Sequence, residues 1–167
     1  NPGNHIILLG PMAKLRKLYI QEGRDEYAEV YKGKILRFYD ANKSKKNKMN
    51  LETLNAIAEI QLAEAREYGL RTKNIQLSFP EKKYNSLLKA KLQSLDEFTA
   101  KAVNVLELGS GDGMVLTYKY LVEVYASVIK DIRSFRPTGK SEAYIKGFTD
   151  SMKKLTNPIL AKTKEFK

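Results

Sequence analysis

Three glycines separated by single residues are the part of this chain whose types and spacing could do chemistry. Gly109, Gly111 and Gly113 end the segment VNVLELGSGDG, residues 103–113. After a β-strand, such glycines let backbone amides approach a nucleotide-type cofactor, and an acidic residue downstream binds the ribose hydroxyls. Asp131 stands at a suitable distance for that second role. The chemistry that this spacing would support is cofactor binding.

The residues around the glycines favour a turn between two helices instead. Apolar residues recur at spacings of three and four from Tyr84 to Leu106, so Val103 belongs to a helical pattern and not to a strand. Asp131 lies inside a second helical pattern. The chain after Gly113 contains no further alternation of strand and helix from which a parallel sheet could be built. An S-adenosylmethionine-dependent methyltransferase, for which this loop is an opening signature, is therefore the disfavoured alternative.

As a turn between two helices, residues 103–113 need no ligand. We interpret Gly109 as ending one helix in a left-handed conformation and Asp112 as capping the next. No catalytic residues, cofactor or metal site are expected elsewhere. The chain has no cysteine, which excludes disulfides, thiolate catalysis and cysteine-based zinc sites, and its single histidine, His5, cannot form a multi-histidine site.

The net charge of +11 suits an acidic protein partner, nucleic acid or anionic lipid. Lysines are spread along almost every segment between apolar positions, as on solvated helix faces. The one dense cluster, KSKKNK at residues 43–48, has no interleaved aromatic residue on which bases could stack. A basic helical domain that binds nucleic acid is therefore an alternative that we rank below a protein partner.

Helical patterns extend over most of the chain and predict an all-α fold in a single domain, residues 1–167. Within it we expect a loose N-terminus at 1–10, a basic loop at 43–49 and an extended connector at 70–79. No run of apolar residues is long enough to span a membrane. The expected helices run from Pro11 to Gly23, from Asp25 to Asp40, from a cap at Asn50 to Gly69, from a capping box at Ser78 to Glu81 as far as the glycine turn, and from Met114 to Phe135. A last helical region starts at a cap on Ser141 and is kinked or divided at Pro158.

The stretch from Lys83 to Phe166 resembles a region of large tetratricopeptide-type proteins of gliding and predatory bacteria. A long helix ends in a V-x-x-L-G-x-G turn, and a helix with a Y-x-x-L-x-x-x-Y pattern follows at Tyr118 to Tyr125. A proline-containing loop and a helix with an internal proline, Pro158, come next. The first half of the chain looks like degenerate repeats without a clean tetratricopeptide consensus. Because no stop signal follows Glu165, we expect the chain to be part of a longer protein.

This resemblance implies a right-handed α-solenoid of antiparallel helix pairs that binds a partner protein and catalyses nothing. It also implies export, which would place the chain in the periplasm or at the cell envelope; the cytoplasm stays an alternative. Solenoid helix pairs expose a concave face for a partner segment, and the positive charge favours an acidic one. The residues predicted to line that face are Arg66, Lys119, Tyr120 and Lys130.

Overall fold

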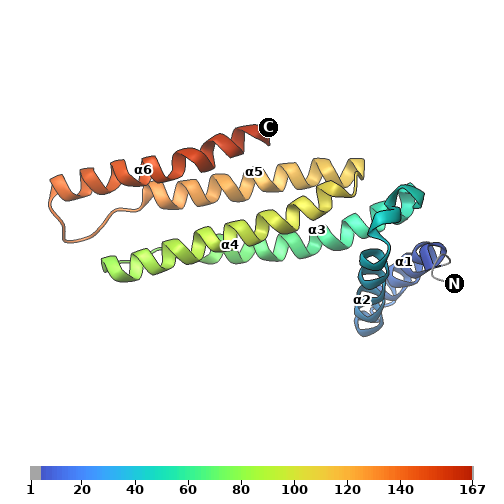
Figure 1. The fold of residues 1–167 in the computed structure, drawn as a ribbon. Helices are drawn as coiled ribbons and strands as arrows, with labels where there is room; N and C mark the ends of the chain where they lie inside the picture. Colours follow the sequence, from blue (N-terminus) through green and yellow to red (C-terminus); the bar gives the residue numbers. More distant parts are fainter. Residues whose placement is uncertain (1–4, 167) are drawn as a thin grey trace. The chain divides into compact units, whose positions relative to one another are not determined.

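The structure is a computed structural model that describes residues 5–166, and every element in it is a helix (Figure 1). Residues 5–166 contain no strand, so the predicted all-α fold class is confirmed. The elements are α1 (His5–Gln21), α2 (Asp25–Ala41), the 3-10 helix η2 (Lys43–Lys48), α3 (Leu51–Asn74), α4 (Glu81–Glu107), α5 (Gly111–Ser134) and α6 (Glu142–Glu165).

The chain forms two compact units, each with its own buried core. Unit 1 comprises Asn1–Leu62 and Asn104–Met114, and unit 2 comprises Ala63–Val103 and Val115–Lys167. Helices α3, α4 and α5 therefore contribute residues to both units. The single domain expected over residues 1–167 stays a prediction.

Unit 1 is built around the hairpin of α1 and α2. Leu9 on α1 and Ile35 and Tyr39 on α2 are buried together with Ile57 on α3 and Leu108 in the turn after α4. Each of these side chains is at most 1% exposed. Apolar burial on this scale, about 25 cal/mol per Å² of surface removed from water, is what holds so short a hairpin against α3.

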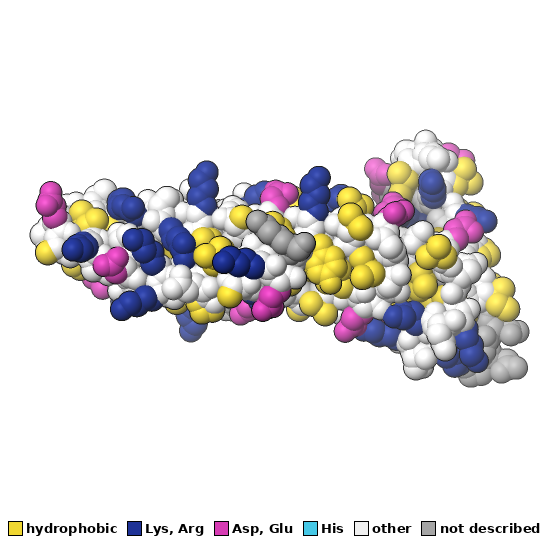
Figure 2. Space-filling model, turned by 90° about the horizontal axis from the view of Figure 1, so that it is seen from above, with side chains coloured by type: hydrophobic (Ala, Val, Ile, Leu, Met, Phe, Trp, Pro, Cys, Tyr) yellow, Lys and Arg dark blue, Asp and Glu magenta, His cyan; other side chains and the backbone are white. Residues whose placement is uncertain are grey.

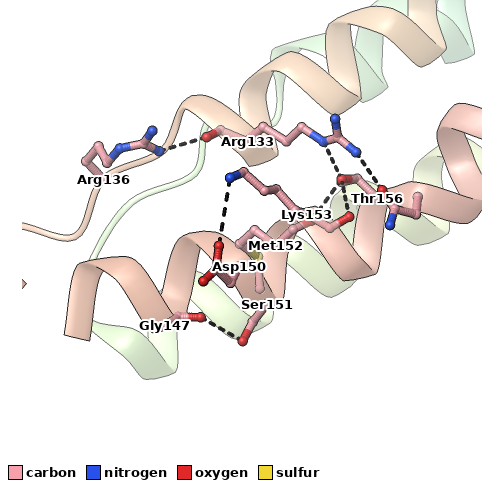
Figure 3. A network of polar contacts seen from close by, with 9 residues as sticks. Arg133, Arg136, Gly147, Asp150, Ser151, Met152, Lys153 and Thr156 are labelled. Carbon is pink, nitrogen blue, oxygen red and sulfur yellow. Dashed lines mark hydrogen bonds and ion pairs between the residues drawn. The ribbon is translucent and has the colours of Figure 1, made fainter. Parts of the chain in front are cut away.

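In unit 2 the long helix α5 is covered by three neighbours (Figure 1). The Tyr120 hydroxyl reaches a carbonyl of α3, the Tyr125 hydroxyl lies 2.9 Å from that of Thr99 on α4, and the Arg133 Nε donates to Thr156 on α6. The sequence predicts this position for α5, because its apolar residues cover most of its circumference. The same arginine also donates to Asn157, so it joins the end of α5 to α6 at two points (Figure 3).

Four buried threonines of unit 2 share one arrangement. Each hydroxyl hydrogen-bonds the carbonyl of the residue four positions earlier in its own helix: Thr72, Thr99, Thr156 and Thr163. For three of them a neighbouring helix supplies a second contact, in the pairs Thr72 with Ser94, Thr99 with Tyr125 and Thr156 with Arg133. These polar groups are thereby satisfied inside an apolar core, where an unpaired hydroxyl would cost about 1–3 kcal/mol.

Two predicted caps are confirmed and two are wrong. The side chains of Asn50 and Ser141 accept backbone N–H bonds at the starts of α3 and α6, as expected. Ser78 is not the cap of α4, because the bond that opens this helix runs from the Tyr84 N–H to the Pro80 carbonyl. Asp112 is likewise not the cap of α5: Ser110 has that role, and Asp112 lies inside the first turn.

Several predicted boundaries differ from the structure. Helix α1 begins at His5 and not at Pro11, because the burial of Leu9 outweighs the one backbone bond that an internal proline removes. Residues 5–10 are thus helical, and residues 1–4 of the expected loose N-terminus lie outside the described part. The expected basic loop at 43–49 contains η2. Helix α6 is not divided at Pro158.

Helix α3 continues past the expected stop at Gly69 to Asn74, so only residues 75–79 of the expected connector at 70–79 lie outside a helix. A glycine stops a helix when the chain needs a positive φ there. Gly69 does not adopt one, although Gly23, Gly109 and Gly139 do. What Gly69 provides instead is space for a side chain of another helix.

Candidate partner-binding surface

The glycine segment forms a tight turn between two helices, and two of its three glycines have a structural reason. Val103 lies within α4, as the helical interpretation predicts, and Gly109 has a φ of +73°. A Cβ on Gly113 would lie 3.0 Å from the Ala58 Cβ, so this glycine permits close packing in unit 1. The Ser110 hydroxyl caps α5 and donates to the Asn55 Oδ1 at 2.7 Å. Gly109 and Gly113 therefore serve the turn and its packing.

Asp131, the acidic residue of the disfavoured cofactor site, pairs with a buried lysine. Its Oδ2 lies 2.8 Å from the Nζ of Lys91 on α4. The Lys91 amine also donates to the carbonyls of Thr72, Lys73 and Ile75, at the end of α3 and just beyond it. A cation is favourable there, because the last carbonyls of a helix have no partner within it and carry its negative partial charge. Asp131 therefore has a structural partner within unit 2.

The structure brings two of the four predicted surface residues into contact. The Tyr120 hydroxyl on α5 donates to the Arg66 carbonyl on α3 at 3.1 Å. Burial raises the pKa of the Tyr120 phenol above its ordinary value. Lys119 and Lys130 are exposed on one stripe of α5 with Glu123 between them, because these residues recur at spacings of four and seven.

The exposed sides of α3 and α5 in unit 2, called the α3/α5 surface below, carry charges that are only partly neutralised. Glu123 pairs with Lys73 on α3 at 2.7 Å, so one acidic residue of the α5 stripe is already bound to a cation. Within residues 5–166, Arg66, Lys119 and Lys130 form no ion pair. The surface therefore offers three exposed cations to an external group.

Gly69 lets α3 and α5 approach each other at this surface. A Cβ on Gly69 would lie 2.7 Å from the Tyr120 Oη and 2.8 Å from the Tyr120 Cε1. The Tyr120 ring also packs edge-to-face on Phe98 of α4, with ring centroids 5.5 Å apart. Tyr120 therefore contacts α3 and α4 and joins both to its own helix, α5. Its ring is not free to contact a partner.

We expect Gly69→Ala to destabilise unit 2 by about 1–2 kcal/mol, although alanine is the better helix former by about 1 kcal/mol. The added methyl displaces the Tyr120 ring and its hydrogen bond, which outweighs the gain in propensity. In a Tyr120→Ala background the space is empty, so the same change stabilises by about 0.5–1 kcal/mol. Chemical denaturation of the four proteins of this cycle measures both values. An equal effect of Gly69→Ala in both backgrounds would contradict the steric explanation.

A polar hollow of about 380 Å³ lies at the end of α3 in unit 2. One wall is the end of α3 with the extended segment after it, and the other is the last two turns of α5. Its uncharged polar side chains come from both walls: Asn74, Gln76, Ser127 and Ser134. This hollow could not be predicted from the sequence. Ile75 and Leu77 line it together with Gln76, so the alternation of apolar and polar residues after α3 does not mark one polar side.

On the face that carries α6, lysine and arginine side chains are scattered among apolar, acidic and uncharged side chains (Figure 2). Dispersed charge of this kind is typical of a solvated surface and does not form the continuous track that a nucleic acid backbone requires. In the described part of the chain, no helix is long and apolar enough to cross a membrane. The same residues hold no group of three or more histidine and carboxylate side chains placed to bind a metal.

Comparison with protein-family models, with curated proteins and with solved structures finds no match to this chain.

Proposed function

We propose that this chain is a non-enzymatic helical scaffold that binds an acidic segment of a partner protein on the α3/α5 surface of unit 2. The surface comprises the exposed sides of α3 and α5, with the three cations of Arg66, Lys119 and Lys130 and the polar hollow at the end of α3. As part of the proposal, the helix pairs form a tetratricopeptide-like solenoid, and the protein acts in the periplasm or at the cell envelope.

The observation that carries the proposal is the contact between the first helices of two successive pairs. Helices α3 and α4 form one antiparallel pair, and α5 and α6 form the next (Figure 1). Tyr120 of α5 packs onto Gly69 of α3, so the first helices of both pairs lie side by side. In solenoid proteins, first helices stacked in this way present a continuous surface to an extended or helical ligand.

The unpaired cations support an acidic partner over a neutral one. Three cations without ion pairs repel one another weakly at the surface, and an acidic segment relieves this repulsion while it steers association. The hollow supports a peptide ligand, because its amide and hydroxyl side chains can donate and accept hydrogen bonds with a peptide backbone. Nothing in this arrangement requires a bound cofactor.

Photo-crosslinking tests the proposal. A photoreactive phenylalanine analogue at position 119 or 130 is expected to crosslink one defined protein in cells of the source organism, identified by mass spectrometry. The triple variant R66E/K119E/K130E is expected to recover that protein at least tenfold less well, because an acidic segment now meets three like charges.

The matched control reverses three exposed lysines of α6, in K146E/K154E/K164E, and has the same net charge change. It should recover the partner as the unmodified chain does. Recovery of no partner at moderate salt would contradict the proposal, as would equal loss in both triple variants. Recovery of nucleic acid, with an affinity that falls steeply with salt, would favour the alternative function.

A further inference from the structure

Helix α1 in unit 1 is apolar on two opposite sides, and only one of them is covered. Leu9 faces the core and is 1% exposed, whereas Ile7 is 72% and Leu18 is 46% exposed. Leu8 and Leu15 are exposed as well. A helix that is apolar on most of its circumference is normally packed between neighbours. Within residues 5–166, no second neighbour covers this side of α1, and an exposed apolar surface of this kind marks an interaction site.

The spacing of the exposed residues fits another helix. Leu8, Pro11, Leu15 and Leu18 follow one another at intervals of three, four and three, which is the spacing of the core positions of a coiled coil. A straight apolar row of this kind is complementary to one face of a single amphipathic helix, which would cross α1 at about 20°.

Two hollows lie on the α3 side of α1, and Pro11 of this row lines the larger of them. They lie between α1 and α3, have volumes of about 320 and 150 Å³, and share Gly10, Lys14 and Glu52 in their walls. Their apolar lining includes Ile6, Ile7, Ala13 and Ile60. A helix packs by inserting side chains into such depressions, whereas a lipid surface has none to insert.

The charge around the hollows selects an acidic helix. Residues 5–21 carry Lys14, Arg16 and Lys17 and no carboxylate. Lys48 adds a fourth cation, against the two carboxylates of Glu52 and Glu59 on α3. Glu52 pairs with Lys14 at 3.3 Å, which leaves Arg16, Lys17 and Lys48 against Glu59. A second copy of this chain would place α1 cations against α1 cations, which disfavours self-association.

We infer that unit 1 has an interaction surface, formed by the exposed row of α1 and the hollows between α1 and α3, that binds an acidic amphipathic helix of another protein. This surface involves different residues from the α3/α5 surface of unit 2, and the inference does not depend on the function proposed for that surface.

The test uses a designed peptide of about three heptads with leucine at the core positions and glutamate at the flanking positions. Fluorescence anisotropy with the whole chain should give a dissociation constant in the micromolar range. The variant L15Q/L18Q should bind at least tenfold more weakly, because two exposed leucines no longer bury apolar surface. Neither leucine is in the core, so far-ultraviolet circular dichroism should show unchanged helix content.

Two controls define specificity. The variant V103Q/V115Q changes two exposed aliphatic residues of unit 2 and should bind the peptide like the unmodified chain. A peptide with lysine in place of glutamate should not bind. R66E/K119E/K130E, which changes the α3/α5 surface, should bind the acidic peptide like the unmodified chain. The peptide experiment therefore tests the unit 1 surface separately from the function proposed for unit 2.

Any of four outcomes would overturn the inference. The first is that the acidic peptide does not bind. The second is that the acidic and the lysine peptide bind with equal affinity, or that L15Q/L18Q binds the acidic peptide as tightly as the unmodified chain does. The third is a dimer in sedimentation that L15Q/L18Q dissociates, which would assign the surface to a second copy. The fourth is binding to vesicles of phosphatidylglycerol that L15Q/L18Q abolishes while the peptide stays unbound, which would assign it to a membrane surface.

Discussion

Replacement of Lys91 by methionine is expected to lower the free energy of unfolding by about 3 kcal/mol. Methionine keeps much of the length and apolar character of the buried stem but has no group to donate to a carbonyl. The carbonyls of Thr72, Lys73 and Ile75 lose their shared donor, and the Asp131 carboxylate loses its cation. Urea denaturation followed by far-ultraviolet circular dichroism measures the change.

Lys89→Met is the matched control, because Lys89 lies on the exposed side of the same helix. Its effect should stay within about 0.5 kcal/mol. Asp131→Asn should cost less than Lys91→Met, since the amine keeps its three carbonyl partners and Asp131 is itself partly exposed. Equal stabilities of the Lys91 and Lys89 variants would show that the buried amine contributes nothing to unit 2.

The second large effect concerns alkaline pH. Burial raises the pKa of the Tyr84 phenol from 10.0 to about 12, and the phenol donates to the Met152 Sδ at 3.1 Å. The folded state therefore holds this proton at a pH where the unfolded state has released it. The stability due to Tyr84 is complete below pH 10 and is lost as the pH rises toward 12, by about 1.4 kcal/mol at pH 11 and about 2 kcal/mol at pH 12.

Tyr84→Phe isolates this contribution, because it keeps the ring that packs on Phe135 and Phe148. At pH 7 the two proteins should differ by less than about 1 kcal/mol, since the hydroxyl gives up only a bond to sulfur. As the pH rises above 10, the unmodified protein should lose the stability due to Tyr84, whereas the phenylalanine variant should not. The difference in free energy of unfolding between the two proteins should therefore shift in favour of the variant from pH 7 to pH 11. Denaturation curves at these two pH values measure the shift, and parallel pH profiles would contradict it.

Periodicity predicted the helices of unit 2 well because their cores are regular. Apolar residues of α4 recur at intervals of three and four from Tyr84 to Leu106, so this stretch could be assigned to a helix in spite of the glycines that follow. The buried positions at its end are Ala102, Val105 and Leu108, whereas Val103 is exposed. The same register contains Lys91, between Leu88 and Leu95. A lysine at a core position was therefore visible in the sequence, but its partners were not, because carbonyls at the end of α3 belong to no sequence pattern.

Local signals failed where a distant residue decides the outcome. Gly69 looks like a helix stop, but the Tyr120 side chain requires a small residue at that place, and only the fold brings the two together. Pro11 looks like a helix start, but the core of unit 1 holds residues 5–10 in the helix. The four predicted surface residues lie on α3 and α5, yet composition could not distinguish Tyr120, which joins helices, from Lys119 and Lys130, which face solvent.

The buried threonines of unit 2 impose a direction on the contacts between its helices. Each hydroxyl has one hydrogen, and in Thr72, Thr99 and Thr156 this hydrogen goes to the helix's own backbone. The oxygen can then only accept, so the residue opposite must be a donor. Serine, tyrosine and arginine meet this demand at positions 94, 125 and 133, whereas a carboxylate at any of them would set two acceptors against each other. The helices thus recognise each other by polarity as well as by shape.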